Sequence, residues 1–214
     1  MDEKLSTIYN AILDGDVTGA KDGVQAALVA DLKPENILDE GMIAAMKEVG
    51  RRFEEGDYYV PEMLVAACAM QSALSLLKPR LVERDVKSAG MVAIGTVKGD
   101  LHDIGKNLVT LMLEGAGFEV KDLGVDVPPE KFVEAIAGGD VNIVALSALL
   151  TTTMPNMKTI IETIQQAGLR DKVKIIVGGA PVTQEFANQI GADGFSADAS
   201  SAPGLAHSLI QQKS

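Results

Sequence analysis

The first 88 residues carry apolar side chains at helical spacing and contain no run of β-branched residues. This pattern predicts four helices, over residues 3–13, 17–30, 34–55 and 61–81. The connections between them are short, which favours antiparallel packing of neighbouring helices. We therefore expect residues 1–88 to form a four-helix bundle.

From residue 89 onward, short β-branched apolar runs alternate with helical segments. The expected strands cover residues 91–97, 119–123, 143–149, 174–177 and 194–196. This alternation predicts an α/β domain over residues 89–214, with a five-stranded, parallel, doubly wound (flavodoxin-like) sheet. Ligands of such sheets bind beyond the carboxyl ends of the strands, so the loops after each strand are the places to look for chemistry.

Composition narrows the class of partner. The formal net charge of −11 divides almost evenly between the two halves, and an evenly acidic chain repels phosphate backbones, so no nucleic-acid partner is expected. No apolar stretch reaches the ~18 residues of a membrane span, and the first residues lack an apolar signal core, so a soluble cytoplasmic protein without a membrane partner is expected. The single cysteine, Cys68, stands among alanines and is expected to be a small buried hydrophobe.

The loop after the first expected strand contains one of the two histidines, His102, between Asp100 and Asp103. An imidazole can ligate a metal through one nitrogen while the other donates to a carboxylate, which fixes the tautomer and raises the basicity of the ligand. Asp100 is close enough for that role, and Gly105 permits a bulky group to approach the backbone. His102 is therefore a candidate metal ligand.

The same loop has other interpretations. Taken alone, the loop favours a helix N-cap beside a solvated histidine over a metal ligand. A phosphate-accepting aspartate, as in receiver-type domains of this architecture, leaves the histidine unexplained. A zinc site needs three or four ligands, and only His207 remains as a second histidine.

Two further motifs, each at the end of an expected strand, support a ligand site at this loop. Ser147-Ala148-Leu149 follows Gly105 after 41 residues, and Gly178-Gly179 follows Leu149 after 28. The combination of Asp-x-His-x-x-Gly, Ser-x-Leu and Gly-Gly, each at a strand end, resembles the fingerprint of base-off, His-on cobalamin-binding domains. The resemblance implies that the cofactor is cobalamin or a related corrinoid, and that His102 replaces its lower base as the axial cobalt ligand.

The resemblance also implies a set of cofactor-binding residues around the strand ends, where the displaced nucleotide tail would run beside small side chains. They are Asp100, Leu101, Asp103, Ile104, Gly105, Ser147, Leu149, Thr151, Thr153, Gly178, Gly179, Ala180, Ala197, Asp198 and Ala199. Similarity to the methionine synthase domain implies that Thr153 completes a His–Asp–hydroxyl relay. Because Pro155 follows, Thr153 is equally suited to cap the next helix.

The helical half resembles the cap of methylcobalamin-carrying domains, through residues 40–43, 49–56 and 60–63. In those caps an aromatic and an aliphatic side chain, seven positions apart, cover the upper face of the corrin. They correspond here to Phe53 and Val60, with Met63 beside them, although methionine synthase usually has leucine where this chain has Val60. By periodicity alone, Phe53 is an ordinary core residue of the bundle.

Together the two halves resemble the small corrinoid proteins of anaerobic methyltransferase systems, with residues 1–88 as the cap and 89–214 as the cobalamin-binding domain. The resemblance implies a non-catalytic carrier in the one-carbon metabolism of methanogenesis or acetogenesis. One substrate-specific methyltransferase would place a methyl group on Co(I), and a second would pass it from methyl-Co(III) to coenzyme M or tetrahydrofolate. A reductive activase is the third implied partner.

Two other functions stay open, and the first of them would use the same Asp-x-His-x-x-Gly loop. The cobalamin subunit of a radical mutase normally lacks the helical cap, and a cobalamin-dependent sensor should carry a basic DNA-binding domain. No residue of the sequence identifies the methyl donor, so methylated amines, methanol and methoxy-aromatics all remain candidate donors.

Overall fold

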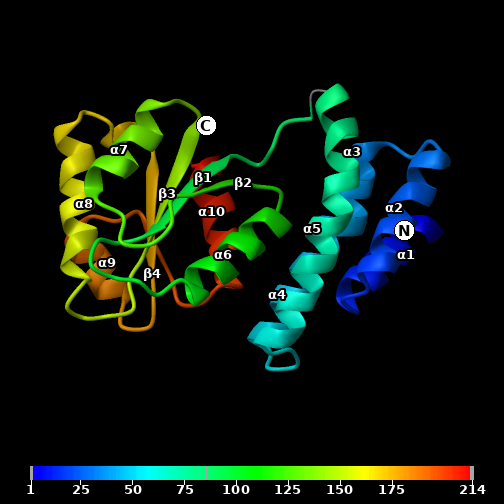
Figure 1. Cartoon of the computed structure of the whole chain (residues 1–214), viewed down its shortest axis with the longest axis horizontal. Coiled ribbons are helices and arrows are strands. Elements are labelled where there is room, and N and C mark those ends of the chain that lie inside the picture. Colours follow the sequence, from blue (N-terminus) through cyan, green and yellow to red (C-terminus); the bar gives the residue numbers. More distant parts are fainter. Residues whose placement is uncertain (1, 85, 213–214) are drawn as a thin grey trace. The chain divides into compact units, whose positions relative to one another are not determined.

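The computed structural model describes residues 2–84 and 86–212, which form two compact units (Figure 1). The described part of residues 1–88, together with residues 114–117, makes the helical unit. The described parts of residues 89–113 and 118–214 make the α/β unit.

The helical unit is a bundle in which α1 packs against α2, and α5 packs against α2 and α4. Its elements are α1 (Glu3–Leu13), α2 (Val17–Val29), α3 (Pro34–Asn36), η1 (Ile37–Ile43), α4 (Ala44–Glu54) and α5 (Val60–Glu83). Asp2 and Asp16 cap the amino ends of α1 and α2 by accepting hydrogen bonds from first-turn amides. The expected four-helix bundle is confirmed, with α3, η1 and α4 following one another as its third helix.

The third helix is not uniformly α-helical, because Ile37–Ile43 is a π-helix. Ile37 and Met42 are both fully buried although they are five positions apart. Residues at that spacing share a face when the hydrogen bonds run from i to i+5, whereas in an α-helix they point apart. The wider turn therefore buries two apolar side chains that α-helical geometry would separate.

Helix α5 corrects two expectations, namely that no apolar stretch reaches the length of a membrane span and that Cys68 is buried. By length and composition alone it is apolar enough to cross a membrane, but its buried side chains pack within the helical unit, as in the core helix of a globular protein. Cys68 is exposed rather than buried. The buried face of α5 includes Ala67, Met70 and Leu77, and Cys68 lies one position past that stripe. Neighbouring alanines therefore did not indicate burial.

The α/β unit is built on one parallel sheet with the strand order β2-β1-β3-β4-β5. The strands are β1 (Met91–Thr96), β2 (Glu119–Asp122), β3 (Val141–Ser147), β4 (Lys174–Gly178) and β5 (Gly194–Ser196). This is the expected doubly wound sheet. Strand β3 begins and ends two residues earlier than expected. It ends earlier because the amides of Leu149 and Leu150 donate to the side chain of Asp100 instead of extending the ladder.

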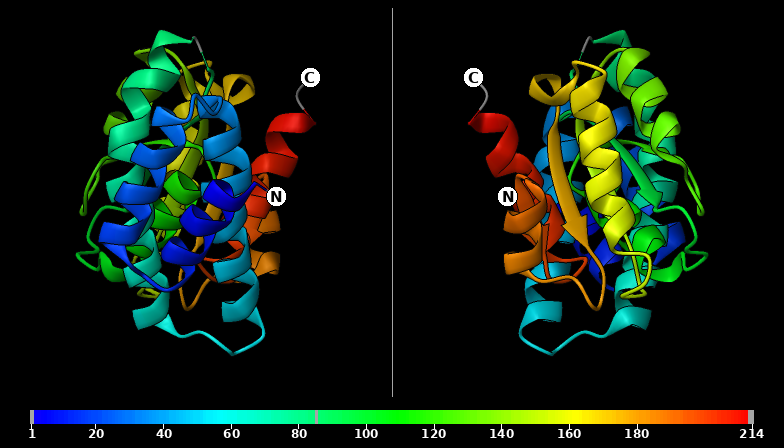
Figure 2. Two further views of the ribbon diagram at one scale, coloured as in Figure 1. Left: turned by 90° about the vertical axis from the view of Figure 1, so that its right-hand side faces the viewer. Right: turned by 90° about the vertical axis from the view of Figure 1, so that its left-hand side faces the viewer.

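Helices cover both faces of this sheet (Figure 1). They are α6 (Ile104–Gly115), α7 (Pro129–Ala137), α8 (Pro155–Gln166), α9 (Gln184–Ile190), α10 (Ser201–Gln211) and the short 3-10 helix η2 (Arg170–Lys172). Helices α7, α8 and α9 share one face, and the right-hand view of Figure 2 shows α8 in yellow on the near side of the sheet. On this face Phe132 is fully buried, and its ring lies so close to Gly95 that a side chain there would collide with it. The strands and helices therefore form one close-packed core that holds the strand ends in place.

Candidate functional site

The register of the sheet brings the carboxyl ends of four strands into one row. Thr96 pairs with Ser147, Ser147 with Gly178, and Gly178 with Ser196. Residues that are far apart in the sequence thus meet at one edge, as a ligand site of this architecture requires.

Next to this row, the carboxylate of Asp100 is buried and receives several hydrogen bonds. Its Oδ1 lies 2.7 Å from His102 Nδ1 and also accepts from the His102 amide at 3.1 Å. Its Oδ2 accepts from the Thr153 hydroxyl at 2.7 Å and from the Leu149 amide at 2.8 Å. Asp100 therefore joins two loops rather than capping a helix.

These donors determine the charge of Asp100. Burial raises the pKa of its carboxyl, but the hydrogen bonds from Thr153, from the His102 ring and from the two amides outweigh burial and hold the pKa well below its ordinary value. The carboxylate is ionised at neutral pH. It therefore keeps a proton on the nearest ring nitrogen, His102 Nδ1.

The ring of His102 is half exposed. Its backbone carbonyl accepts a hydrogen bond from the buried hydroxyl of Thr96 at 2.8 Å, which fixes the residue from the other side. Since Nδ1 faces Asp100, Nε2 is the nitrogen that remains for a ligand. This is the arrangement of a metal-binding histidine whose second nitrogen is held by a carboxylate.

The surface around His102 suits a large, flat and largely apolar group. Leu101 and Ile104 are 72% and 79% exposed, and Leu149 and Leu150 are each 42% exposed. A side chain added at Gly105 would meet nothing within 4 Å, so the backbone at the start of α6 lies open. Exposed apolar side chains gathered at a polar centre mark a binding surface, and they suit a large, flat ligand such as a corrin macrocycle.

The glycines at the end of β4 have a structural reason of their own. Gly179 has a φ of +132°, and a Cβ there would lie 1.9 Å from the carbonyl oxygen of Ala148. A Cβ at Gly178 would lie 3.2 Å from the carbonyl oxygen of Ser196. The protein's own backbone therefore requires glycine at position 179, and at position 178 it leaves a side chain only tight contact with Ser196. Ala180, next to them, is exposed.

The loop after β5 is organised by Asp198, whose carboxylate accepts from the Ser200 hydroxyl and the Ser201 amide. Burial raises the pKa of Asp198, but these donors lower it below its ordinary value overall. Ala197 is exposed, as is Thr151 in the loop after β3, whereas Ala199 is buried. The side chain of Ala199 therefore does not line an open channel in this structure.

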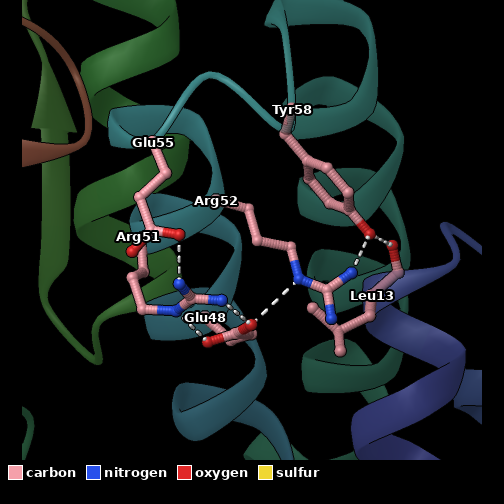
Figure 3. A network of polar contacts seen from close by, with 6 residues as sticks. All are labelled: Leu13, Glu48, Arg51, Arg52, Glu55 and Tyr58. Atoms are coloured by element: carbon pink, nitrogen blue, oxygen red, sulfur yellow. Dashed lines mark hydrogen bonds and ion pairs between the residues drawn. The ribbon is translucent and has the colours of Figure 1, made fainter.

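The expected cap residues lie around the connection between α4 and α5. Phe53 is half-buried and Val60 is 39% exposed, whereas Met63 is fully buried and would have to be uncovered to touch a ligand. A polar network holds this connection (Figure 3). Arg52 donates to Glu48 and to the Tyr58 hydroxyl, and that hydroxyl donates to the carbonyl oxygen at the end of α1. Figure 3 also shows Arg51 between two glutamates, and the arginines lower the pKa of Glu48 to about 2.

Sequence reasoning missed several residues that shape the site. Thr96 holds the His102 carbonyl, Asp126 binds the loop before Asp100, and Asn156 donates to the Lys98 carbonyl at 2.7 Å. Thr96 carried a usable signal, since it is a polar residue at the end of an apolar strand. Asp126 and Asn156 carried none, because their contacts depend on how distant loops meet.

Comparison with known proteins agrees with this site. Residues 90–203 match the family model of a B12 binding domain, and residues 5–78 match a second model with the same description. Trimethylamine corrinoid protein 1 of Methanosarcina acetivorans is 45% identical over 194 residues, covering 90% of each chain. The dimethylamine corrinoid protein of Methanosarcina barkeri is 42% identical over 207 residues, covering 95% of this chain and 97% of the other.

Solved structures are similar over nearly the whole chain. The methanol:cobalamin methyltransferase complex MtaBC of Methanosarcina barkeri contains a chain with a TM-score of 0.85 and 32% identity, covering 98% of this chain and 80% of that one. A cobalamin-binding protein of Desulfitobacterium hafniense has a TM-score of 0.79 and 32% identity, covering 98% of each chain. The chain therefore belongs to the corrinoid proteins of methyltransferase systems, which bind a cobalamin-type corrinoid.

Proposed function

We propose that this chain is a methyl carrier that serves two methyltransferases and has no complete active site of its own. The observation that supports this most strongly is the chain of contacts from His102 through Asp100 to Thr153, set in an exposed apolar surface. This arrangement offers one ring nitrogen to cobalt and holds the other on an ionised carboxylate. A separate substrate pocket is not part of the proposal, because both methyl transfers would take place with partner enzymes.

The bound corrinoid would supply the cobalt on which the methyl group travels. His102 Nε2 would bind the lower face, and Asp100 would orient the ring and make it a stronger donor. A ring nitrogen Nε2 that is free of a ligand can hold a proton, and the Asp100 carboxylate 2.7 Å from Nδ1 would stabilise the resulting imidazolium. Thr153 would keep the second carboxylate oxygen satisfied throughout, so that binding and release of the ring are coupled to charge at one site.

The residues of the helical unit would protect the upper face. In this proposal residues 1–88 are the cap and residues 89–214 the cobalamin-binding domain. Phe53 and Val60 would cover the methyl group, on a connection held by Arg52 and Tyr58. In this proposal the cap would move to admit partners, with a hinge in residues 81–88, of which residue 85 is outside the described part of the chain.

The relatives support a methylated amine as the methyl donor. Relatives named for trimethylamine and dimethylamine are 45% and 42% identical, whereas the chain from the methanol complex is 32% identical. The proposed partners are a methylamine-specific methyltransferase, a second methyltransferase that passes the group to coenzyme M or tetrahydrofolate, and a reductive activase. We place the carrier in the cytoplasm, without nucleic acid or membrane as a partner.

Methyl loading tests the proposal directly. The purified chain is loaded with cobalamin, reduced, and mixed with a methyltransferase and its donor, using trimethylamine, dimethylamine and methanol enzymes in parallel. We expect the absorption spectrum of the methylated corrinoid with an amine enzyme, and much slower conversion of protein-free corrinoid under the same conditions. No conversion with any enzyme, together with selective binding of adenosylcobalamin, would favour the mutase subunit instead.

A further inference from the structure

The segment between β1 and α6 is held by a residue from another loop. Asp126, between β2 and α7, accepts a hydrogen bond from the Gly99 amide through Oδ1 at 2.7 Å. The Asp126 amide donates to the carbonyl oxygen of Asp100 at 2.9 Å. One residue therefore binds two backbone groups on either side of the link between residues 99 and 100.

The backbone on both sides of this contact is specialised. Asp126 has a φ of +53° and Gly99 a φ of +82°, both in the left-handed region. Aspartate is among the few residues with a side chain that enter this region readily. Directly beside the contact, Val97 and Val127 form a parallel bridge, so the two loops run side by side where Asp126 joins them.

The contact acts on the part of the loop that orients the histidine. Asp100 is fully buried, and its side chain extends from backbone whose carbonyl oxygen accepts from the Asp126 amide. The His102 ring depends in turn on Asp100 Oδ1, 2.7 Å from Nδ1. We propose that Asp126 is a positioning residue for the axial ligand, because it fixes the backbone of Gly99 and Asp100 and so aims His102. This inference rests on the axial role proposed above for His102.

A positive φ at an aspartate does not by itself link that residue to the site. Asp140 also has a positive φ, of +61°, but it precedes β3 at the amino end of the strands, away from the site. What distinguishes Asp126 is the pair of hydrogen bonds to the loop that contains Asp100 and His102. Asp140 therefore provides a control with the same backbone conformation and no link to the site.

The test compares four variants of the cobalamin-loaded chain: Asp126→Gly, Asp126→Asn, Asp140→Gly and His102→Ala. Glycine removes the carboxylate without straining the backbone, and asparagine keeps an acceptor oxygen. Electron paramagnetic resonance of the Co(II) form, with histidine labelled by the heavy nitrogen isotope, measures the fraction of cobalt bound by histidine from its two-line splitting. Nitrogen from the cofactor's own base gives three lines instead. Hydrogen exchange of the Gly99 amide in cofactor-free protein measures whether the loop is released.

We expect Asp126→Gly to lower that fraction about tenfold, as the loss of an outer-shell partner does, and to speed exchange at Gly99. Asp126→Asn and Asp140→Gly should keep the wild-type fraction. If Asp126→Gly does not fold, Asp126→Glu, which displaces the carboxylate by one methylene, should show the same loss. A full histidine signal in Asp126→Gly, with that signal lost in His102→Ala, would overturn the positioning role alone. A two-line histidine signal retained in His102→Ala would overturn the axial assignment as well.

Discussion

The Thr153 hydroxyl lies 2.7 Å from Asp100 Oδ2, while the other oxygen of that carboxylate lies 2.7 Å from His102 Nδ1. The loop after β3 and the loop after β1 are thereby joined through one buried carboxylate. The same hydroxyl lies 2.9 Å from the Leu150 carbonyl oxygen, a second acceptor that shares its one proton. The hydroxyl therefore serves Asp100 and not the start of α8, where no side chain caps the helix.

The first prediction concerns this hydroxyl. Thr153→Val preserves the shape of the side chain but leaves Asp100 Oδ2 with one donor fewer, and should destabilise the cofactor-free protein by about 1–3 kcal/mol. Thr153→Ser keeps the donor and should stay close to wild type. Urea denaturation followed by circular dichroism measures both. A loss of stability in Thr153→Ser with none in Thr153→Val would show that packing of the methyl group matters and the hydrogen bond does not.

The second prediction concerns pH. Because the pKa of Asp100 is lower in the folded chain than its ordinary value of 3.8, the unfolded chain binds the proton first as the pH falls. The contribution of Asp100 to stability is thus complete above that ordinary value and is lost progressively below it. Asp100→Asn should be less stable at neutral pH, and its stability should fall less steeply than that of wild type between about pH 5 and about pH 2. Parallel stability curves for the two proteins would contradict this account.

The third prediction separates two glycines of the fingerprint. Gly105→Ala adds a methyl group where nothing lies within 4 Å, so the cofactor-free protein should keep its stability or gain up to about 1 kcal/mol of helix propensity. Gly179→Ala places a Cβ against the Ala148 carbonyl and should destabilise it by about 1–3 kcal/mol or more.

Cobalamin affinity should respond to Gly105→Ala even though stability does not. Gly105→Ala should weaken binding without a change in fold, because its methyl group points into the space that the corrin needs. Titration of the cofactor-free variants with cobalamin measures this. Wild-type affinity in Gly105→Ala would show that the corrin does not contact the backbone at Gly105.

The fourth prediction concerns the cap. Phe53→Ala should speed the loss of the methyl group from the loaded protein in light, because the aromatic ring no longer shields it. Val29→Ala, at a side chain of the same helical unit that is 77% exposed, is the control and should behave as wild type. Absorption spectra recorded under constant illumination give both rates. The same rate in all three proteins would leave Phe53 as a core residue only.

The sequence predicted those parts of the molecule that follow from local periodicity. Alternating helical and β-branched runs indicated the bundle and the parallel sheet, and the strand ends at Ser147 and Gly178 do lie in one row. Cys68 and the π-helical segment were not predicted, because which face of a helix is buried depends on its neighbours. Asp126 was not predicted either, since its contact with Gly99 exists only after β1 and β2 have paired.

The central claim is that His102, and not His207, binds the cobalt. Histidine labelled with the heavy nitrogen isotope changes the splitting in the paramagnetic resonance of the Co(II) form from three lines to two if the axial ligand is a histidine. We expect the two-line pattern in labelled wild type and in labelled His207→Ala, and its loss in His102→Ala. The account is contradicted if the pattern survives in His102→Ala, or if labelling leaves three lines in wild type.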